Sequence, residues 1–188
     1  MSSDGVIATC AHVIDTEGMK IREGGLIAVD QTGKVFPVKA ILANDPKMDA
    51  AFIKIDCATV PLPLNDQIRP GDESFCLSRP LGQKDYFSQG MVNRFYWDSH
   101  KRGDDDSSLT ALAHLKLNVS SRWAPGSSGS PVVDTFGNAI GHVALIHSLG
   151  NGSPADLKGK AKEASKTMIT LHTATPARSL IALAKGMP

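Results

Sequence analysis

The sequence lacks both a marked excess of one charge and any long apolar run. Its 188 residues include 20 basic and 19 acidic side chains, which gives a formal net charge of +1. This balance provides no electrostatic reason to expect a nucleic acid or an anionic membrane as a partner. No apolar run approaches the roughly 18 residues that a membrane-spanning helix requires, so we expect no insertion into a membrane.

The N-terminal residues lack the features of a signal peptide. The segment MSSDGVIATCAHVI has no basic stretch followed by an apolar core and a cleavage site. The sequence therefore assigns no compartment, and an extracytoplasmic location stays open if further residues precede Met1.

Cysteine is scarce, and its pattern does not indicate a metal site. Cys10, Cys57 and Cys76 are an odd count without the spacing of metal ligands. Each lies in an apolar run, so we predict buried free thiols, which neither require nor exclude an oxidising compartment. The three aspartates at residues 104–106 fit a solvated loop better than a metal site. We expect neither a metal nor a cofactor.

Short β-rich segments, separated by turn residues, dominate the chain. Residues 25–30 and 35–44 flank a tight turn at Gly33, which is the pattern of a β-hairpin. Further candidate strands lie at residues 50–56, 73–78, 90–97, 111–119, 130–134, 138–148 and 166–174. Strands at this spacing without intervening helices predict an all-β, antiparallel sandwich or pair of barrels.

One helix is predicted, near the C-terminus. Thr175 can cap it, Pro176 suits its first turn, and the amphipathic residues 177–185 are followed by Gly186 as a stop.

Three polar residues stand out beside apolar segments. His12 follows an apolar strand, Asp49 precedes an alternating strand, and Ser128 lies between glycines in the segment PGSSGSP. A serine hydroxyl is a weak nucleophile near neutral pH and needs an adjacent base. Imidazole can accept its proton and later return it, while a carboxylate on the other ring nitrogen fixes the tautomer. We therefore predict Ser128 as nucleophile, His12 as general base and Asp49 as its orienting group.

The glycines around Ser128 predict a second part of the site. Glycine allows backbone amides to turn toward one point without a Cβ in the way. The negative charge that develops on a carbonyl oxygen during attack needs such donors. We expect the backbone N–H groups of Gly126 and Ser128 to form an oxyanion hole.

The same segments resemble the trypsin-like (chymotrypsin-fold) serine peptidases, and within them the HtrA/Deg-type proteases. The histidine motif is TCAHV (9–13), the aspartate motif is DAAFIKI (49–55) and the nucleophile loop is GSSGSP (126–131). Further family motifs correspond to RPGDESFCLSRPLG (69–82), SQGMVN (88–93) and FGNAIGHVALI (136–146). The resemblance covers most of residues 5–186, and we expect a protease domain without a PDZ-type extension.

The resemblance implies two six-stranded antiparallel barrels with the site in the cleft between them. We expect an N-terminal lobe over residues 1–82 and a C-terminal lobe over residues 83–188, with the change of barrel near residues 80–88. Only eleven residues precede His12, whereas the family histidine follows roughly two strands. The first barrel is therefore expected to lack its opening strand or strands. Upstream sequence, a partner or another segment would then cover the open edge.

Two residues of the nucleophile loop depart from the family pattern. Ser127 replaces the usual asparagine, which should be tolerated because that side chain is not catalytic. Ser130 replaces a glycine. If that position requires a positive φ, a serine there costs about 1 kcal/mol or more.

The resemblance also implies residues of a substrate pocket. Arg122 stands six residues before the nucleophile, where a carboxylate would select basic side chains, so cleavage after lysine or arginine is not expected. Arg122 favours an acidic substrate residue if it points inward, but it can also lie at the surface. Trp123 either borders the pocket or packs in the core. Val143 and Ala144 would form an apolar wall suited to small or medium aliphatic side chains.

Two functions of different classes follow. The first is a serine endopeptidase that hydrolyses polypeptide substrates through an acyl-enzyme on Ser128. The alternative is a catalytically silent trypsin-like domain that binds a peptide or protein partner. Separation of His12 and Ser128 beyond hydrogen-bond reach would favour the alternative. Family members are often trimers, so a homo-oligomer also stays open.

Overall fold

The computed structural model describes residues 3–15, 25–97, 112–150 and 167–187. Its elements in chain order are β1 (Val6–Thr9), α1 (Ala11–Ile14), β2 (Ile27–Val29), β3 (Val35–Asp45), β4 (Ala50–Ile55), β5 (Glu73–Ser78), the 3₁₀ turn η1 (Pro80–Gly82), β6 (Tyr86–Trp97), β7 (Leu115–Val119), β8 (Pro131–Val133), β9 (Ala139–Gly150), β10 (Thr167–Pro176) and α3 (Ala177–Lys185). The acidic run at residues 104–106 lies outside the described residues.

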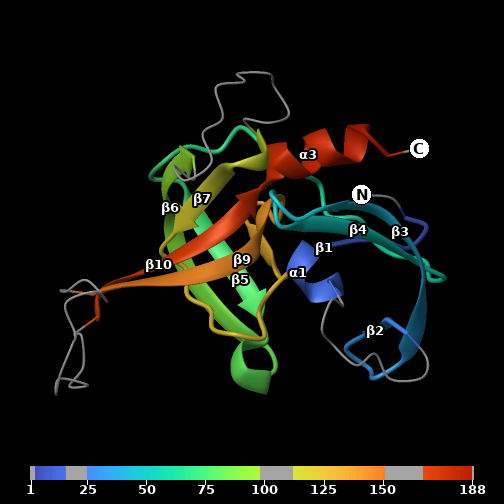
Figure 1. The fold of residues 1–188 in the computed structure, drawn as a ribbon. Coiled ribbons are helices and arrows are strands. Elements are labelled where there is room, and N and C mark those ends of the chain that lie inside the picture. Colours follow the sequence, from blue (N-terminus) through green and yellow to red (C-terminus); the bar gives the residue numbers. More distant parts are fainter. Residues whose placement is uncertain (1–2, 16–24, 98–111, 151–166, 188) are drawn as a thin grey trace, which may run out of the picture.

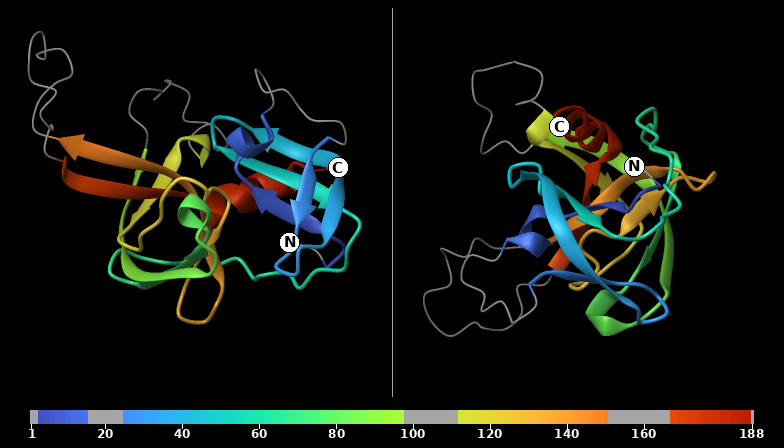
Figure 2. Two further views of the ribbon diagram at one scale, coloured as in Figure 1. Left: turned by 90° about the horizontal axis from the view of Figure 1, so that it is seen from below. Right: turned by 90° about the vertical axis from the view of Figure 1, so that its right-hand side faces the viewer.

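Two antiparallel sheets build the molecule, and they lie side by side (Figure 1; Figure 2). The first is an open sheet with the strand order β1-β4-β3-β2, and the second is a closed barrel with the order β10-β7-β6-β5-β8-β9. The predicted all-β fold with one C-terminal helix is confirmed. The predicted deficit of the first barrel is also confirmed, because its described part is a four-stranded sheet with β1 and β2 as free edges.

The chain changes from one sheet to the other earlier than expected. β5 pairs with β6 over its whole length and also with β8, so it belongs to the closed barrel. The change therefore falls between Ile55, where β4 ends, and Glu73, where β5 begins, rather than near residues 80–88. Hydrophobic periodicity identifies a strand but not the sheet to which it hydrogen-bonds, which is why the sequence misplaced this boundary.

The closed barrel is held together by a core of alternating inward side chains. Leu117 and Val119 of β7 belong to this core, as do Val132 of β8 and Ile140 of β9, and all four are almost fully buried. Burial of each such side chain stabilises the fold by about 1.5–3 kcal/mol. Lys116, which precedes Leu117, points to the other face of β7, where its ammonium donates to the Met48 carbonyl in the turn between β3 and β4.

The open sheet is covered on both faces near its centre. Successive residues of β4 point to opposite faces, as a strand requires. Phe52 packs with Leu180 of α3 on one face, and Ile53 packs with Ile14 of α1 on the other. The two helices thus supply the cover that a complete barrel would supply for itself.

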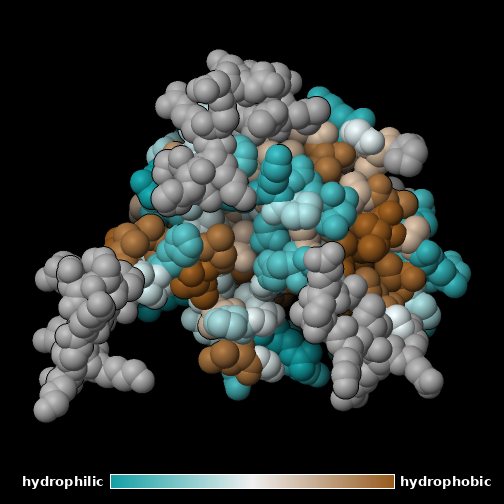
Figure 3. Space-filling model, in the orientation of Figure 1, coloured by the Kyte–Doolittle hydropathy of each residue, from teal (hydrophilic) through white to brown (hydrophobic). Residues whose placement is uncertain are grey.

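The β2–β3 end of the open sheet stays exposed. Ile27, Val29 and Val35 are exposed to 54%, 57% and 52%, and Val29 lies opposite Val35 across the hairpin. Hydrophobic surface also gathers at the right of Figure 3, over the region where Figure 1 draws β3 and β4. Exposed apolar side chains are not confined to this sheet, because Phe87, Met91 and Trp97 of β6 in the closed barrel are exposed to 61%, 51% and 57%.

α3 begins directly after β10 and ends at Gly186, as predicted. The predicted cap is wrong: Pro176 is the N-cap residue and makes no side-chain bond there. The Thr175 hydroxyl instead donates to the Met48 carbonyl at 2.9 Å, because the neighbouring sheet offers a buried acceptor. No helix in the described part of the chain is long and apolar enough to cross a membrane.

Candidate active site

His12 lies in α1, a single helical turn at the end of β1. Thr9 is opposite Ala51 in the β1–β4 pair, so the turn that follows starts beside Asp49. Ala11 is buried and fixes the turn, whereas the His12 side chain is 49% exposed and faces the closed barrel. The local strand pairing thus brings the first two predicted site residues together.

Asp49 stands at the end of the turn between β3 and β4. The Asp45 carboxylate closes this turn by accepting the amide protons of Lys47 at 2.8 Å and Met48 at 3.0 Å. Asp49 then takes a left-handed backbone conformation with φ of 57°. Aspartate tolerates that region better than most residues with a Cβ, but it costs free energy unless neighbours hold it.

Ser128 lies in the loop between β7 and β8, and two glycines shape this loop. Gly126 has φ of 97° and Gly129 has φ of 81°. Ser130 is not among the described residues with positive φ, so its replacement of a glycine causes no backbone strain of the kind considered above. The left-handed positions fall on the residues that can adopt them without cost.

A continuous series of hydrogen bonds joins the three residues. Both Asp49 carboxylate oxygens lie 2.9 Å from His12 Nδ1, and the His12 backbone N–H donates to Asp49 Oδ1 at 3.1 Å. His12 Nε2 lies 2.9 Å from Ser128 Oγ. A carboxylate can only accept, so Nδ1 carries the ring proton and Nε2 is left to accept the Ser128 hydroxyl proton. This is the tautomer that base catalysis at a serine requires.

Only some backbone amides of the nucleophile loop donate hydrogen bonds to the described part of the protein. The N–H groups of Ser127, Gly129 and Ser130 donate to backbone carbonyls. Those of Gly126 and Ser128 donate to no acceptor in the described part of the chain. The two amides predicted as an oxyanion hole are therefore available to a ligand.

One carbonyl ties the loops of the two lobes together. The Val143 carbonyl accepts the Gly129 N–H at 2.9 Å and the Cys10 thiol at 2.9 Å. A side chain at Gly129 would bring its Cβ to 2.7 Å from Thr9 Oγ1, so the loops approach too closely for any larger residue. The β1 end and the nucleophile loop thus lie in direct contact.

Cys10, His12 and Asp49 place potential metal-ligating atoms within 4.8 Å of one another. The imidazole and the carboxylate are already hydrogen-bonded to each other, and the Cys10 thiol donates a hydrogen bond to the Val143 carbonyl. Burial, reinforced by the negative charge of Asp49, raises the pKa of the Cys10 thiol far above its ordinary value, so the metal-binding thiolate is disfavoured. The short distances within this cluster are therefore explained by these hydrogen bonds. The prediction of buried free thiols is confirmed for Cys10 and Cys76, whereas Cys57 is free but partly exposed.

Three buried polar residues of the closed barrel also reach the site; the sequence pattern suggested only a helix cap for Thr175 and no role for Lys116 or His142. Lys116, His142 and Thr175 are 6%, 3% and 0% exposed, and each donates to a carbonyl next to or at Asp49. A lysine or histidine within an apolar strand is itself a signal, since buried polar groups require partners. The sequence does not reveal which carbonyls those partners are.

The four residues predicted to form a substrate pocket lie in different surroundings. Arg122 is exposed, and Ser88 pairs with its backbone N–H and carbonyl. Trp123 is buried in the barrel core, where its ring nitrogen donates to the Leu145 carbonyl. Val143 and Ala144 are also buried. Their roles in substrate selection stay predictions.

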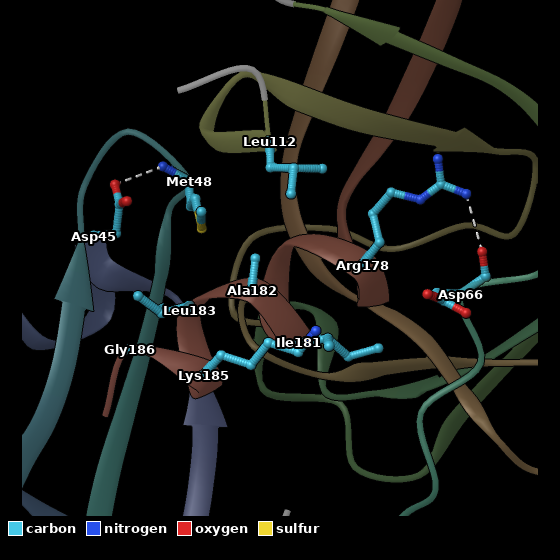
Figure 4. A pocket seen from close by; sticks show the side chains of 10 residues that line it. All are labelled: Asp45, Met48, Asp66, Leu112, Arg178, Ile181, Ala182, Leu183, Lys185 and Gly186. Carbon is cyan, nitrogen blue, oxygen red and sulfur yellow. Dashed lines mark hydrogen bonds between the residues drawn. The ribbon is translucent and has the colours of Figure 1, made fainter. Parts of the chain in front are cut away.

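A groove of about 680 Å³ runs beside α3, and it includes Asp45 and Met48 of the turn that precedes Asp49 (Figure 4). Its lining residues are Asp45, Met48, Asp66, Leu112, Arg178, Ile181, Ala182, Leu183, Lys185 and Gly186. Figure 4 shows Arg178 reaching across to the Asp66 carbonyl, with which it forms a 3.0 Å hydrogen bond. The groove contains none of the three hydrogen-bonded residues, so it is separate from the candidate active site.

The sequence profile of the trypsin-like peptidase domain matches residues 1–141, which is most of the chain. The chain therefore belongs to the trypsin-like peptidase family. It is similar to curated relatives of the HtrA/Deg type. It shares 29% identity with the putative protease Do-like 14 of Arabidopsis thaliana, over 87% of this chain and 39% of the relative. It shares 24% identity with the putative serine protease HhoB of Synechocystis, over 81% of this chain and 34% of the relative.

Solved structures show the same fold. The HtrA-type protease AlgW with a decapeptide matches with a TM-score of 0.66 at 24% identity, over 98% of this chain and 49% of that chain. The serine endoprotease from Yersinia pestis matches with a TM-score of 0.65 at 21% identity, over 98% and 54% of the two chains. The chain thus spans about half of these solved chains and 34–39% of the two curated relatives.

Proposed function

We propose that the protein is a serine endopeptidase that cleaves polypeptides through an acyl-enzyme on Ser128. The observation that carries this proposal is the series Asp49–His12–Ser128, in which the side chains approach one another at 2.9 Å. The 2.9 Å contact between His12 and Ser128 also supports hydrolysis over the silent-binding alternative. Named serine proteases among the relatives support the same reaction class.

The proposed reaction begins with attack by Ser128 Oγ on the peptide carbonyl carbon. The hydroxyl proton passes to His12 Nε2 while Asp49 stabilises the imidazolium that forms. The oxyanion accepts hydrogen bonds from the N–H groups of Gly126 and Ser128. His12 then gives the proton to the departing amine as the C–N bond breaks, which leaves an ester on Ser128. Water, deprotonated by His12, hydrolyses this ester and restores the enzyme.

Polypeptides are the proposed substrate class. A relative of known structure was solved with a decapeptide, which fits this class without fixing a cleavage preference. The exposed Arg122 and the apolar Val143 and Ala144 favour the expectation of small or medium aliphatic residues over basic ones at the cleavage position.

The test is covalent labelling with a fluorophosphonate probe at pH 8, read by intact-mass spectrometry and peptide mapping. We expect one probe on Ser128 and none on Ser128→Ala. The His12→Ala variant should label slower by several orders of magnitude, because removal of a nucleophile or its base costs about 10⁶-fold in a serine protease.

Ser127→Ala is the matched control. Ser127 is adjacent in sequence, but its hydroxyl is buried, so its loss should leave the labelled site unchanged. Folded wild-type protein that takes up no probe, or a Ser128→Ala variant that labels at the wild-type rate, would contradict the proposal.

A further inference from the structure

Three side chains of the closed barrel donate hydrogen bonds to the turn that carries the Asp49 carboxylate. His142 Nε2 lies 3.0 Å from the Asp49 carbonyl oxygen. Lys116 Nζ and Thr175 Oγ1 both donate to the Met48 carbonyl, at 3.0 Å and 2.9 Å. These three donors come from β9, β7 and β10, whereas the two carbonyls belong to the turn between β3 and β4 of the open sheet. The contacts therefore cross from one lobe to the other.

These hydrogen bonds fix both peptide groups around the Asp49 Cα. The Met48 carbonyl belongs to the peptide before Asp49, and the Asp49 carbonyl belongs to the peptide after it. Holding both carbonyls toward the barrel sets φ and ψ of Asp49, and with them the direction of its Cβ. A left-handed aspartate persists only where its surroundings impose that conformation. Here the three donors hold the two carbonyls, while the Asp45 carboxylate holds the amides of Lys47 and Met48.

His142 is suited to this task because it stays neutral and its donor is fixed. A carbonyl can only accept, so Nε2 must carry the ring proton. Nδ1 is buried and has no partner among the described residues. The groups that face the ring are Asp49, Lys116 and His12. Burial above all, with the positive charge of Lys116, lowers the pKa of His142 to about 4. The ring is therefore a neutral donor near neutral pH.

We propose that His142 is a positioning residue, which donates to the Asp49 carbonyl and thereby aims the Asp49 carboxylate at His12. Lys116 and Thr175 assist by holding the preceding peptide. The proposal rests on the proposed hydrolytic function for its catalytic consequence, but the geometry that it describes can be measured without turnover. It predicts that the open sheet presents a competent Asp49 only when it is docked on the barrel.

The test compares His142→Gln with His142→Asn. The glutamine amide nitrogen is the same number of bonds from the backbone as His142 Nε2, so it can still donate to Asp49. The asparagine amide is too short to do so. Both variants lose the imidazole packing, so a merely structural role predicts equal losses in melting temperature and equal labelling per folded molecule.

We expect the asparagine variant to react with the fluorophosphonate probe about tenfold to a hundredfold slower per folded molecule, since a displacement near 1 Å in a catalytic group has such effects. The glutamine variant should recover most of the rate. With a peptide substrate, the loss should fall on kcat and leave KM unchanged. Equal rates for the two variants would overturn the proposal.

A second readout does not depend on activity. The His12 Nδ1 proton, held by the carboxylate, should give a far-downfield signal in the proton NMR spectrum of wild type and His142→Gln, and this signal should be lost in His142→Asn. If wild type fails to label, the proposed hydrolysis fails, while a signal lost only in the asparagine variant still supports the positioning role. If the asparagine variant does not fold, Thr175→Val replaces it. If the NMR signal is unchanged in both Thr175→Val and His142→Gln, the result would count against a role of these hydrogen bonds between the lobes in positioning Asp49.

Discussion

The two lobes contribute to one site but differ in how they hold themselves together. Every strand of the closed barrel is paired on both sides, and its core residues are almost fully buried. Among the described residues, the open sheet keeps two free edges, at β1 and at β2. It nevertheless carries His12 and Asp49, two of the three residues of the candidate site. The positioning role proposed for His142 would make the geometry of these two residues depend on the barrel.

The largest expected effect tests whether the lobes unfold as one unit. Phe52 is 1% exposed in the open sheet, so Phe52→Ala should lower the free energy of unfolding by about 3–5 kcal/mol. Both tryptophans, Trp97 and Trp123, belong to the barrel lobe, whereas far-UV circular dichroism reports both sheets. If the contacts across the lobes make unfolding cooperative, both probes should show the same lowered midpoint in urea.

Val29→Ala is the control for this comparison. Val29 is 57% exposed in the same sheet, so its truncation should change stability by no more than about 0.5 kcal/mol. A tryptophan transition that stays at its wild-type midpoint in Phe52→Ala would mean that the barrel folds independently of the open sheet.

The next effect concerns pH and the buried histidine between the lobes. Burial keeps the pKa of His142 at about 4 in the folded protein, against an ordinary value near 6.5 in the unfolded chain. Between these values the unfolded state binds more protons, so stability is full above about pH 6.5 and falls as the pH is lowered toward 4. The contribution amounts to about 2–3 kcal/mol between pH 7.5 and 4.5.

Urea midpoints at these two pH values measure this contribution. His142→Gln should flatten the pH dependence by that amount, while His147→Gln, at an exposed position, should not. His172, whose pKa is also lowered by burial, keeps its own contribution in both variants. A pH dependence in His142→Gln as steep as in wild type would show that His142 is not buried neutral between the lobes.

The smallest expected effect isolates the contact between the lobes from backbone strain. Gly129 and Gly137 share a φ of 81°, but a Cβ at Gly129 would meet Thr9 Oγ1 at 2.7 Å, whereas one at Gly137 meets nothing within 4 Å. Gly137→Ala should cost about 1 kcal/mol, and Gly129→Ala about 1–2 kcal/mol more because of overpacking. Urea denaturation measures both.

The double variant Thr9→Ala/Gly129→Ala provides the check. Removing the hydroxyl should recover part of the extra cost, because the contact is then relieved. Equal losses of unfolding free energy in Gly129→Ala and Gly137→Ala would mean that the β1 end and the nucleophile loop move apart easily. The site would then tolerate a larger distance between these two loops.

Much of this site could be predicted from short motifs, because the chemistry restricts which residues can appear together. His12, Asp49 and Ser128 were identified from their neighbours in sequence, and the structure places them within hydrogen-bond distance. Gly126 and Gly129 of the nucleophile loop both have positive φ, which glycine adopts without a Cβ penalty, while the oxyanion hole stays a prediction.

What the sequence did not reveal depends on contacts between distant segments. The pattern of Thr175 fits a helix cap, but a carbonyl from the other lobe takes its hydroxyl. The alternation of β5 is compatible with either sheet, and only pairing with β6 and β8 decides the matter. His142 stood in an apolar strand without an assigned role, because its acceptor lies 93 residues away in the chain.

The carbonyl of Val143 has a practical consequence for recombination of related proteins. It serves the β1 end through Cys10 and the nucleophile loop through Gly129 at the same time. A chimera that exchanges one lobe for that of a relative would have to transplant residues 9, 10 and 129 as a matched set. Otherwise the Val143 carbonyl oxygen would face donors from two different proteins whose positions are not matched to accept both hydrogen bonds.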